Sequence, residues 1–339
     1  MYYKIGLLFD GPNMEISKVE AKYSDQQKKD TMEQIYKILS KNHKIVKIQV
    51  DEKISENLVK SGVDIVFNLS TGVRGESRQS QIPALLEMLG IPYVGSGILA
   101  HSLALNKAMA KEIFQYHGVP TPAFQVFQTG EESFDTKLTF PLIAKPACEG
   151  SGFGIHKDSV VYDEQGLMKK VNELLGKYEP PVLVEEFIEG REFTVGVIGN
   201  GKNKRILPIL EIDFEDVPEE VGKFYTFEVK NDFGDQTKYH CPAPIGSALE
   251  KSIMESVSRA FDVLGCKDIA RVDVLVKNDQ PYIIEINSLP GLKPLHSDLP
   301  KMAVVAELSY KELIMEILDV AIERQIDRLP EFKPKVINL

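Results

Sequence analysis

The 339-residue sequence has few cysteines, no long apolar run and no excess of basic residues. Its three cysteines, Cys148, Cys241 and Cys266, lie far apart without CxxC spacing, which argues against a disulfide framework and against a zinc site. No apolar stretch approaches the roughly 20 residues that cross a bilayer, and the run that ends at Asp10 is too short for a signal-peptide core. We therefore expect a protein of the reducing cytoplasm with no membrane partner.

Acidic residues outnumber basic ones, 50 to 40, which gives a formal net charge of −10 with histidine neutral. Nucleic acids and anionic membranes select basic patches, so this balance argues against either as a partner. Hydrophobic residues make up 43% of the chain, enough for a sizeable core, and the length suggests about two domains. A globular enzyme that acts on small molecules fits these values best.

Strand and helix patterns alternate along the first hundred residues. Because parallel strands are joined by crossover helices, this alternation predicts a doubly wound parallel sheet. We therefore expect an α/β fold whose N-terminal domain spans residues 1–100. The patterns are strands at 5–9, 45–50 and 63–69 and helices at 32–39 and 82–89.

A single helix is expected around residues 103–116. Gly118 is a typical helix cap and Pro120 follows it, so the helix should end there. Beyond it, short strands and hairpin turns predict antiparallel pairing. These strands are expected at 140–145, 181–185 and 193–198, within a small central α+β subdomain, residues 101–187, and a C-terminal mixed-sheet subdomain, residues 188–339.

The segment from residue 221 to 240 is polar and is interrupted by Gly222 and Gly234. Since it has little apolar content to bury, it is predicted to be a mobile surface loop, and we interpret it as a candidate lid. After it, a helix with a broad apolar face is expected at 313–322.

Two strands near the C-terminus are joined by a short polar turn. A turn centred on Asp279 sets Asp273 opposite Glu285, and because side chains alternate between faces, Asn287 shares the face of Glu285. Two carboxylates and an amide oxygen are hard ligands suited to Mg²⁺. The alternative is a solvated outer face, but like charges that face each other are destabilising without a cation. We therefore predict a magnesium site here.

A glycine-rich segment, Gly150-Ser-Gly152-Phe-Gly154, follows an apolar run that ends near Lys145. Glycine lets backbone N–H groups approach a phosphate closely. The segment is neither a GxxxxGK[ST] loop nor a GxGxxG after a first strand, so a glycine-rich hairpin tip is an equal alternative. Lys145 and Lys107 can each neutralise phosphate charge, although an isolated lysine usually serves solubility.

A carboxylate cluster follows the apolar run at 182–184, and it includes Glu185, Glu186 and Glu192. An extended backbone offers the donor and acceptor that an adenine edge needs, and a carboxylate can accept from ribose hydroxyls. The alternative is an edge strand whose charges discourage aggregation.

Glu15 lies beyond the first expected strand. Ligands of open α/β sheets bind beyond the carboxyl ends of strands, so Glu15 is placed to receive a substrate ammonium. Helix capping by Asn13 or Ser17 is the commoner explanation of such a segment.

Taken in order, these residues resemble the D-alanine-D-alanine ligase branch of the ATP-grasp superfamily, and the match covers nearly the whole chain. The combination is far more specific than any single motif. The resemblance implies an ATP-grasp fold. The matching residues are Gly75-Glu76, Pro92-Tyr-Val-Gly-Ser96, Lys107, Lys111, Lys145-Pro146, Glu149-Gly-Ser151, Glu185, Glu192, Arg271-Val-Asp273, Glu285-Ile-Asn287 and Pro290-Gly291.

The resemblance implies ATP and magnesium as cofactors. Two Mg²⁺ ions, or Mn²⁺ in their place, would bind Asp273, Glu285 and Asn287. The backbone of Glu186 and Ile188 would read adenine. The residues expected to bind ATP are Lys107, Lys145, Gly150, Ser151, Gly152, Glu185, Glu186, Ile188, Glu192 and Lys230.

The same resemblance implies residues for the two substrates. Arg271 would stabilise the oxyanion of a tetrahedral intermediate. Glu15 and Ser151 would orient the amine of the first substrate. Gly291 and Ser297 would lie near the second substrate.

Three departures from the family pattern lie around the amino-acid sites. In the family, a tyrosine follows the lysine that matches Lys230, and it completes a hydrogen-bonded set with the residues that match Glu15 and Ser151. Asn231 replaces this tyrosine in the catalytic position. The usual histidine before Gly72 is Thr71, and Ser77-Arg78 stands where Asp-Gly is usual. The nucleotide and metal residues are kept.

The implied activity is that of an ATP-dependent, ADP-forming carboxylate-amine ligase, which forms an amide through an acyl phosphate in a homodimer. Because of Asn231 and the altered segment 71–78, we favour a ligase that joins an amino acid to a small carboxylate in secondary metabolism. The alternative is D-alanine-D-alanine synthesis for cell-wall peptidoglycan. A further alternative is a non-catalytic nucleotide-binding module, against which Arg271 and the metal residues argue.

Overall fold

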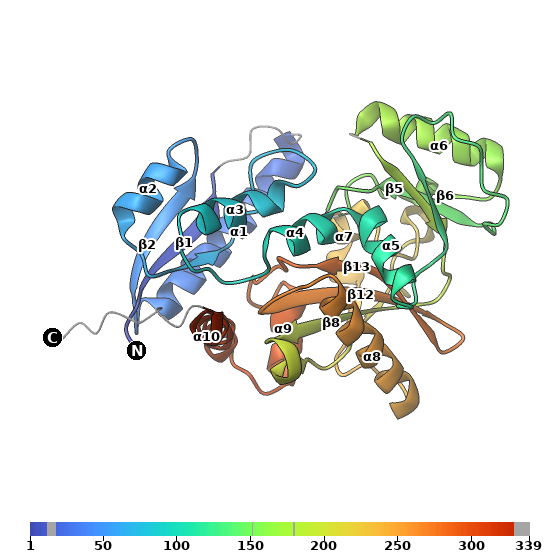
Figure 1. Ribbon diagram of the computed structural model, residues 1–339. Helices are drawn as coiled ribbons and strands as arrows, with labels where there is room; N and C mark the ends of the chain where they lie inside the picture. The colour runs from blue at the N-terminus through green and yellow to red at the C-terminus, as the bar shows by residue number, and fades with distance from the viewer. Residues whose placement is uncertain (12–17, 151, 179, 329–339) are drawn as a thin grey trace.

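The computed structural model describes residues 1–11, 18–150, 152–178 and 180–328. Three β-sheets with helices packed on them follow one another along the chain (Figure 1). Within the described ranges, no helix is long and apolar enough to cross a membrane. The mixture of parallel and antiparallel sheets with covering helices confirms the expected α/β class.

The first sheet confirms the predicted βαβ opening. Its order is β2-β1-β3, and both pairings are parallel. One face packs on helices α2 and α3, and the other packs on α1 and the C-terminal helix α10. The elements are β1 (Lys4–Asp10), α1 (Lys18–Leu39), β2 (Lys44–Val50), α2 (Ile54–Ser61), β3 (Ile65–Asn68), α3 (Gln81–Met88) and α10 (Tyr310–Arg328).

The helix predicted over 103–116 is instead two helices, α4 (Ile98–Leu105) and α5 (Lys107–Tyr116). Asn106 separates them with an extended backbone, and its side chain caps α5 by accepting a hydrogen bond from Met109 N at 3.1 Å. Asparagine favours such caps because its side chain satisfies a backbone N–H that has no intrahelical acceptor. Gly118 has φ +62°, as a helix-ending residue requires.

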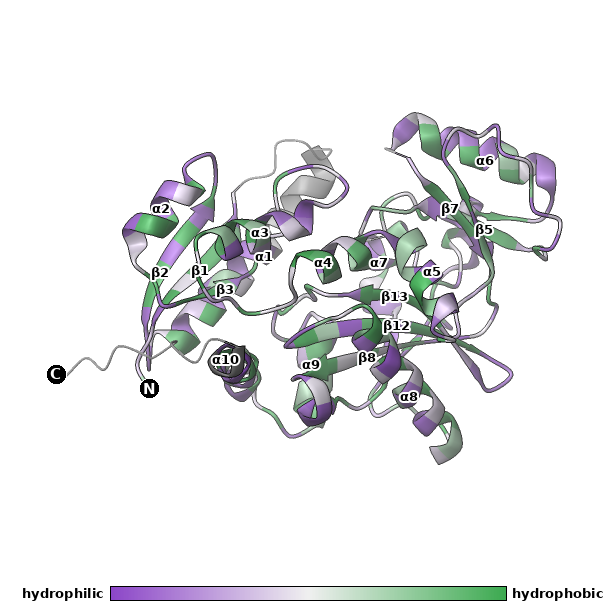
Figure 2. Cartoon of the chain, viewed as in Figure 1, coloured by the Kyte–Doolittle hydropathy of each residue, from purple (hydrophilic) through white to green (hydrophobic). Residues whose placement is uncertain are grey.

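The second sheet is antiparallel, in the order β4-β7-β5-β6, and α6 packs on one of its faces. In Figure 2, β5 is largely hydrophobic and α6 alternates between hydrophobic and hydrophilic residues, as a helix on a sheet requires. Because β7 lies between β4 and β5, the edge-strand alternative for this run is wrong. The elements are β4 (Phe124–Phe127), β5 (Leu142–Pro146), β6 (Val160–Val161), α6 (Glu164–Lys177) and β7 (Val182–Glu186).

The third sheet has the order β11-β10-β8-β12-β13, with β9 paired to β8. Helix α8 packs on one face, and α9 and α10 pack on the other. The elements are β8 (Arg191–Ile198), β9 (Arg205–Ile206), β10 (Leu210–Asp213), β11 (Lys238–His240), α8 (Ser247–Val263), β12 (Ile269–Lys277), β13 (Gln280–Asn287) and α9 (Asp298–Val305).

The β12-β13 hairpin pairs Asp273 with Glu285, as predicted, but for a different reason. The turn is Asn278-Asp279, both with positive φ, so Lys277 pairs with Gln280 and an undisturbed ladder would set Asp273 opposite residue 284. A β-bulge between Asp273 and Val274 shifts the register by one residue. Bulges re-aim side chains near active sites, and this one puts the two carboxylates opposite each other.

The prediction that residues 221–240 have little to bury is wrong. This segment contains helix α7 (Phe227–Asp232) and strand β11, which pairs with β10. Thr226 caps α7 by accepting from Val229 N at 3.1 Å, and the Val229 side chain is completely buried in the core. A few apolar and aromatic residues are therefore sufficient to pack residues 221–240, the lid.

An ion pair joins the first and third sheets. Arg324 of α10 lies 2.7 Å from Asp268, which is completely buried, and Asp268 also accepts from Gly95 N at 2.8 Å. Arg324 donates further to the carbonyl of Tyr93 at 2.9 Å. These contacts fix the N-terminal sheet relative to the strand that carries the predicted metal ligands.

We expect folding stability to fall in acid because of His101. It is buried in α4, its Nδ1 lies 2.7 Å from Ser288 Oγ, and burial lowers its pKa from 6.5 to about 4. Between pH 6.5 and pH 4 the unfolded chain binds a proton that the folded chain excludes, so stability is lost as pH falls through this window. The loss is about 3 kcal/mol at most.

Urea unfolding followed by circular dichroism at pH 7 and pH 4.5 measures this loss. His101→Asn removes the titrating ring and should flatten the dependence on pH. An equally steep decline in this variant would assign the acid sensitivity to other groups.

Candidate active site

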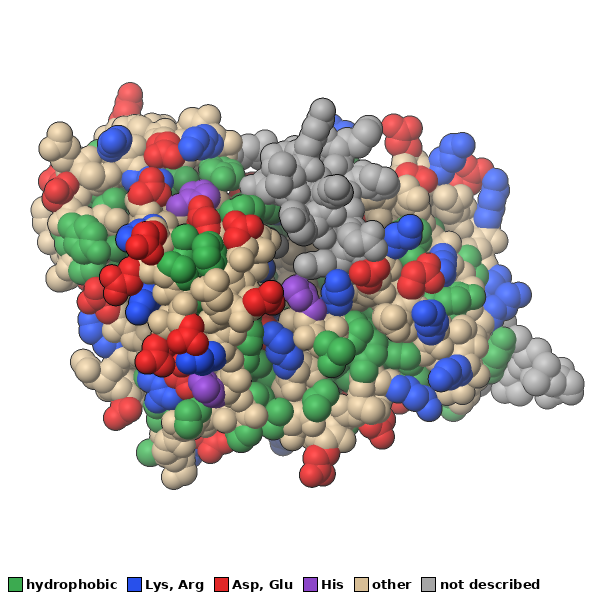
Figure 3. All heavy atoms as spheres, turned by 180° about the vertical axis from the view of Figure 1, so that it is seen from behind, with side chains coloured by type: hydrophobic (Ala, Val, Ile, Leu, Met, Phe, Trp, Pro, Cys, Tyr) green, Lys and Arg blue, Asp and Glu red, His purple; other side chains and the backbone are tan. Residues whose placement is uncertain are grey.

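A cavity of about 1570 Å³ lies between the three sheets. Strands β1, β5, β7, β12 and β13, the glycine-rich loop and the lid all contribute to its lining. Figure 3 shows a hollow between two halves of the molecule, with acidic, basic and histidine side chains at its rim. Such a cavity between sheets, with convergent charged groups, is typical of ligand sites.

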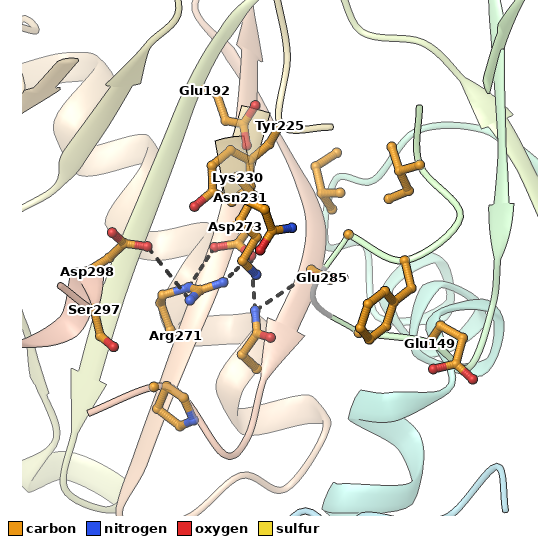
Figure 4. Close-up of a pocket in the computed structure, with 18 of the residues that line it drawn as sticks. Glu149, Glu192, Tyr225, Lys230, Asn231, Arg271, Asp273, Glu285, Ser297 and Asp298 are labelled. Carbon is orange, nitrogen blue, oxygen red and sulfur yellow. Dashed lines mark hydrogen bonds and ion pairs between the residues drawn. The ribbon is translucent and has the colours of Figure 1, made fainter. Parts of the chain in front are cut away.

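The structure brings the three predicted metal ligands together. Asn287 Nδ2 lies 3.0 Å from Asp273 Oδ2 and 3.4 Å from Glu285 Oε1 (Figure 4). Thr194 Oγ1 donates to Asp273 Oδ1 at 2.6 Å and so orients this carboxylate. Among the described residues no three His, Cys, Asp or Glu side chains are grouped so that they could hold a metal ion, so the predicted set consists of two carboxylates and one amide.

The electrostatics of this face suit a divalent cation. Burial, together with the charges of Asp273 and Glu285, raises the pKa of Glu192 to about 8. Burial also raises the pKa of Asp273, against the opposing effect of Arg271. Carboxylates that resist ionisation because they are crowded gain a partner when a cation binds. The oxygen-rich donor set fits Mg²⁺.

Arg271 lies beside this set. Its Nε and Nη2 bind both oxygens of Asp273 at 3.0 and 2.9 Å, and Nη1 lies 3.8 Å from Asp298. Burial acts to lower the pKa of Arg271, but Asp273 and Asp298 raise it far above its usual range. The guanidinium is therefore a permanent cation in the cavity.

Glu285 faces cations from the opposite wall. Burial would raise its pKa, but Lys107, Lys145 and Arg271 lower it to about 2. Lys107 Nζ lies 3.5 Å from Glu285 and also donates to the carbonyl of Glu149, at the start of the glycine-rich loop. Lysines between an acidic face and a glycine-rich loop are positioned to bind phosphates.

Glu185 lies in a buried cluster with two lysines. It accepts from Lys145 and lies 2.7 Å from Lys111, which is completely buried. Burial lowers the pKa of Lys111 to about 8 even though Glu185 opposes the shift. Burial would raise the pKa of Glu185, but the two lysines hold it below its usual value. Glu185 thus fixes the position of Lys145. The sequence did not reveal that Lys111 is the second partner of Glu185.

The described part of the glycine-rich loop lines the cavity. Gly150 and Gly152 face it, and Gly152 and Gly154 have φ +79° and +74°, which a residue with a Cβ adopts only with strain. Ser151 lies outside the described residues, as does Glu15.

The predicted adenine and ribose residues follow β7. The N–H of Glu186 donates to Ala123 O at 2.9 Å, so only its carbonyl can serve a nucleotide, together with the N–H of Ile188. The Glu186 side chain accepts from Thr139 N at 2.9 Å. Glu192 lines the cavity near the acidic face, as Figure 4 shows.

The lid supplies Lys230 and Asn231. Burial and the charge of Arg271 lower the pKa of Lys230, whose side chain points toward the acidic face in Figure 4. Asn231 Nδ2 donates to Phe227 O at 2.8 Å, a bond within α7. Burial and Asp298 raise the pKa of Tyr225.

The region predicted for the second substrate is closely packed. A Cβ on Gly291 would lie 2.8 Å from Ser297 Oγ, and this hydroxyl accepts from Lys293 N at 3.1 Å. Asp298, which the sequence analysis missed, is buried between Arg271 and Lys301, with Lys301 at 3.2 Å. Because Asp298 directly follows Ser297, which was predicted to lie near the second substrate, its position in the sequence could have indicated that it belongs to the site.

Asp10 is a second residue that the sequence analysis missed. At the carboxyl end of β1, it accepts from Ser70, from Lys28 at 2.7 Å and from Thr71 Oγ1 at 2.8 Å. The available signal was its place at the end of the first parallel strand, where ligands of such sheets bind. Thr71, at the family's histidine position, is therefore tied to this wall of the cavity.

These features define an ATP-grasp ligase: three sheets around one cavity, with a glycine-rich loop and two lysines facing an acidic hairpin. Residues 113–319 match the family described as D-ala D-ala ligase C-terminus. The chain belongs to the D-alanine-D-alanine ligase family.

Individual relatives agree with this assignment. The chain is 38% identical over 276 residues to the D-alanine-D-alanine ligase of Syntrophotalea carbinolica, covering 81% of this chain and 85% of that protein. It is 39% identical over 261 residues to the uncharacterized protein y4sG of Sinorhizobium fredii, covering 77% and 75%. The crystal structure of D-alanine-D-alanine ligase from Bacillus anthracis complexed with ATP matches with a TM-score of 0.75, 25% identity and coverage of 96% and 99%.

The chain is accordingly an ATP-dependent, amide-forming ligase of this type. These relatives favour the enzyme over the non-catalytic nucleotide-binding module. They do not confirm the secondary-metabolism hypothesis that the sequence analysis preferred, and they fit the D-alanine-D-alanine alternative better.

Proposed function

We propose that this protein joins two molecules of D-alanine. The observation that carries the proposal is the placement of Arg271 and the three hard ligands opposite Lys107, in a chain that is 38% identical to a D-alanine-D-alanine ligase. In this arrangement one cavity holds groups that can neutralise the charge of the nucleotide phosphates and the charge that develops on the reacting acyl oxygen. The altered residues Thr71 and Asn231 also line that cavity, and in this proposal they lie near the amino-acid substrates.

In the first step the carboxylate of one D-alanine attacks the γ-phosphorus of ATP, and the bond to the β-γ bridging oxygen breaks with its electrons passing to ADP. Lys107 and Lys145 hold the phosphates under the glycine-rich loop. Asp273, Glu285 and Asn287 would hold Mg²⁺, two ions in this proposal, which would offset the charge on the transferring group. The product is an acyl phosphate.

In the second step the amine of the other D-alanine attacks the acyl carbon, the bond from that carbon to the phosphate oxygen breaks, and the proton that the amine loses passes to the departing phosphate. Arg271 stabilises the oxyanion that forms on the way. Glu15 and Ser151 orient the first amine, and Gly291 and Ser297 contact the second substrate. The lid excludes water that would hydrolyse the acyl phosphate.

We also propose that the chain works as a homodimer in the cytoplasm and that its domains divide at residues 100 and 187. The core that α10 shares with the first sheet supports a close association of the first and last of these parts. Light scattering after gel filtration tests the dimer.

ADP release across a panel of amino acids tests the proposed substrate. With ATP and Mg²⁺, D-alanine alone should give ADP and an equal amount of dipeptide, because one molecule supplies the carboxylate and another supplies the amine. L-Alanine is the matched control and should give neither. Turnover that requires a second, different carboxylate would overturn the proposal and restore the secondary-metabolism hypothesis.

A further inference from the structure

The glycine-rich loop and the lid are far apart in the sequence but contact each other directly in the structure. Phe227 N, at the start of α7, donates to Ile155 O at 2.8 Å. The rings of Phe153 and Phe227 stack with centroids 5.7 Å apart. A Cβ on Gly152 would lie 3.7 Å from Phe227 Cα, so the loop lies flat against the first turn of α7.

A hydrogen-bonded side-chain pair closes the same contact. His156 Nδ1 lies 2.6 Å from Glu228 Oε1, and neither side chain is fully exposed, at 41% and 34%. The other carboxylate oxygen, Glu228 Oε2, is buried and has no hydrogen-bond partner in the described part of the chain. His156 therefore binds one oxygen of this carboxylate, and loss of that bond would leave a partly buried group without the hydrogen bond that offsets its desolvation.

Each member of the pair is fixed to its own segment. The N–H of His156 donates to Ser159 Oγ at 3.0 Å, and this bond ties the end of the loop to the turn before β6. On the lid side, Val229 is completely buried next to Glu228 and anchors α7 in the core. A movement of either segment is thus transmitted to the other through the pair.

We propose that His156 and Glu228 are positioning residues that hold the glycine-rich loop and the lid as one unit over the nucleotide phosphates. Neither residue touches the reacting atoms. When a triphosphate holds the glycine-rich loop in place, the pair holds α7 with it and keeps Lys230 in the cavity. The lid therefore responds to nucleotide before any amino acid binds.

This inference rests on the proposed function only in taking ATP as the nucleotide. Its test contains no amino acid, so a failure of D-alanine in the ADP assay would leave it unaffected. Trypsin cleavage after Lys223, which is 46% exposed at the edge of the lid, is measured with and without a non-hydrolysable ATP analogue and Mg²⁺. In the wild-type protein the analogue should slow this cleavage.

Separate His156→Ala and Glu228→Ala variants should each lose most of that protection and raise the KM for ATP, by roughly tenfold, with a smaller change in kcat. The double variant should be no worse than either single variant, because both remove one contact. His156→Lys places an ammonium donor opposite Glu228 and should recover protection. A merely structural role would not be rescued in this way.

Glu33→Ala is the matched control, since Glu33 pairs with Lys47 at 2.7 Å and is 40% exposed but lies on α1, outside both the glycine-rich loop and the lid. It should keep full protection. No protection in the wild-type protein, unchanged protection in His156→Ala, or additive losses in the double variant would each overturn the proposal.

Discussion

Replacing Glu285 with alanine should reduce kcat for ADP formation by about a thousandfold, the loss typical of removing a preorganised group that stabilises transition-state charge. Glu285 faces Lys107 and lies beside Asp273 and Asn287, so its removal takes away a hard ligand and leaves Lys107 without its carboxylate. The change removes charge at a partly exposed side chain and not a core contact, so the fold should remain. Steady-state kinetics at saturating ATP measures the effect.

Measuring ATP binding with and without Mg²⁺ distinguishes the loss of a metal ligand from a general loss of ATP binding. Glu285→Ala should bind ATP more weakly with Mg²⁺ and almost unchanged without it, as seen by equilibrium dialysis. Glu255→Ala, which removes an exposed carboxylate 3.8 Å from Lys251 on α8, is the matched control and should behave as wild type. Wild-type turnover in Glu285→Ala would refute the assignment of the metal site.

Replacing Glu185 with alanine should lower the free energy of unfolding by about 3 to 5 kcal/mol, the range for breaking a buried ion pair by removing one partner. Lys111 and Lys145 are almost completely buried, and Glu185 is the carboxylate that contacts both. Without it, two buried ammonium groups lose their partner and the pKa of Lys111 should fall further below 8. Urea unfolding followed by circular dichroism measures the loss, because the chain has no tryptophan.

Glu56→Ala is the control for this prediction. Glu56 also pairs with a lysine, Lys60, but both side chains are exposed, at 57% and 71%, so its removal should cost less than about 1 kcal/mol. Glu185→Gln keeps the shape of the side chain and should lose less than alanine does. Equal stability of Glu185→Ala and Glu56→Ala would contradict the prediction. It would mean that water or other side chains replace Glu185 as the partner of the buried lysines.

Local patterns were sufficient for most of the elements. The strands at 5–9, 45–50 and 63–69 were predicted because period and apolar content are properties of neighbouring residues, and the structure confirms them as β1, β2 and β3. The pattern failed at Asn106, where a cap divides one apolar stretch into two helices. It also failed for the lid, since the burial of Val229 depends on residues far from it in the sequence.

The acidic hairpin was predicted correctly through two errors that cancel. The prediction centred the turn on Asp279, whereas the turn is centred between Asn278 and Asp279. A bulge beside Asp273 compensates for this difference and restores the pairing with Glu285. Bulges have no reliable local signal, because they depend on how β12 fits both β8 and β13. The predicted face was therefore right, while the geometry that creates it was visible only in the structure.

Local sequence patterns were enough to fix the alternation of strands and helices and the residues that share one face of the hairpin, because both follow from the repeat of the backbone over a few residues. The partner of each carboxylate was visible only in the folded chain: Lys111 for Glu185, Arg271 for Asp298 and His156 for Glu228. Each of these pairs joins segments distant in the sequence, and pairing across such distances depends on packing and desolvation that no local pattern records.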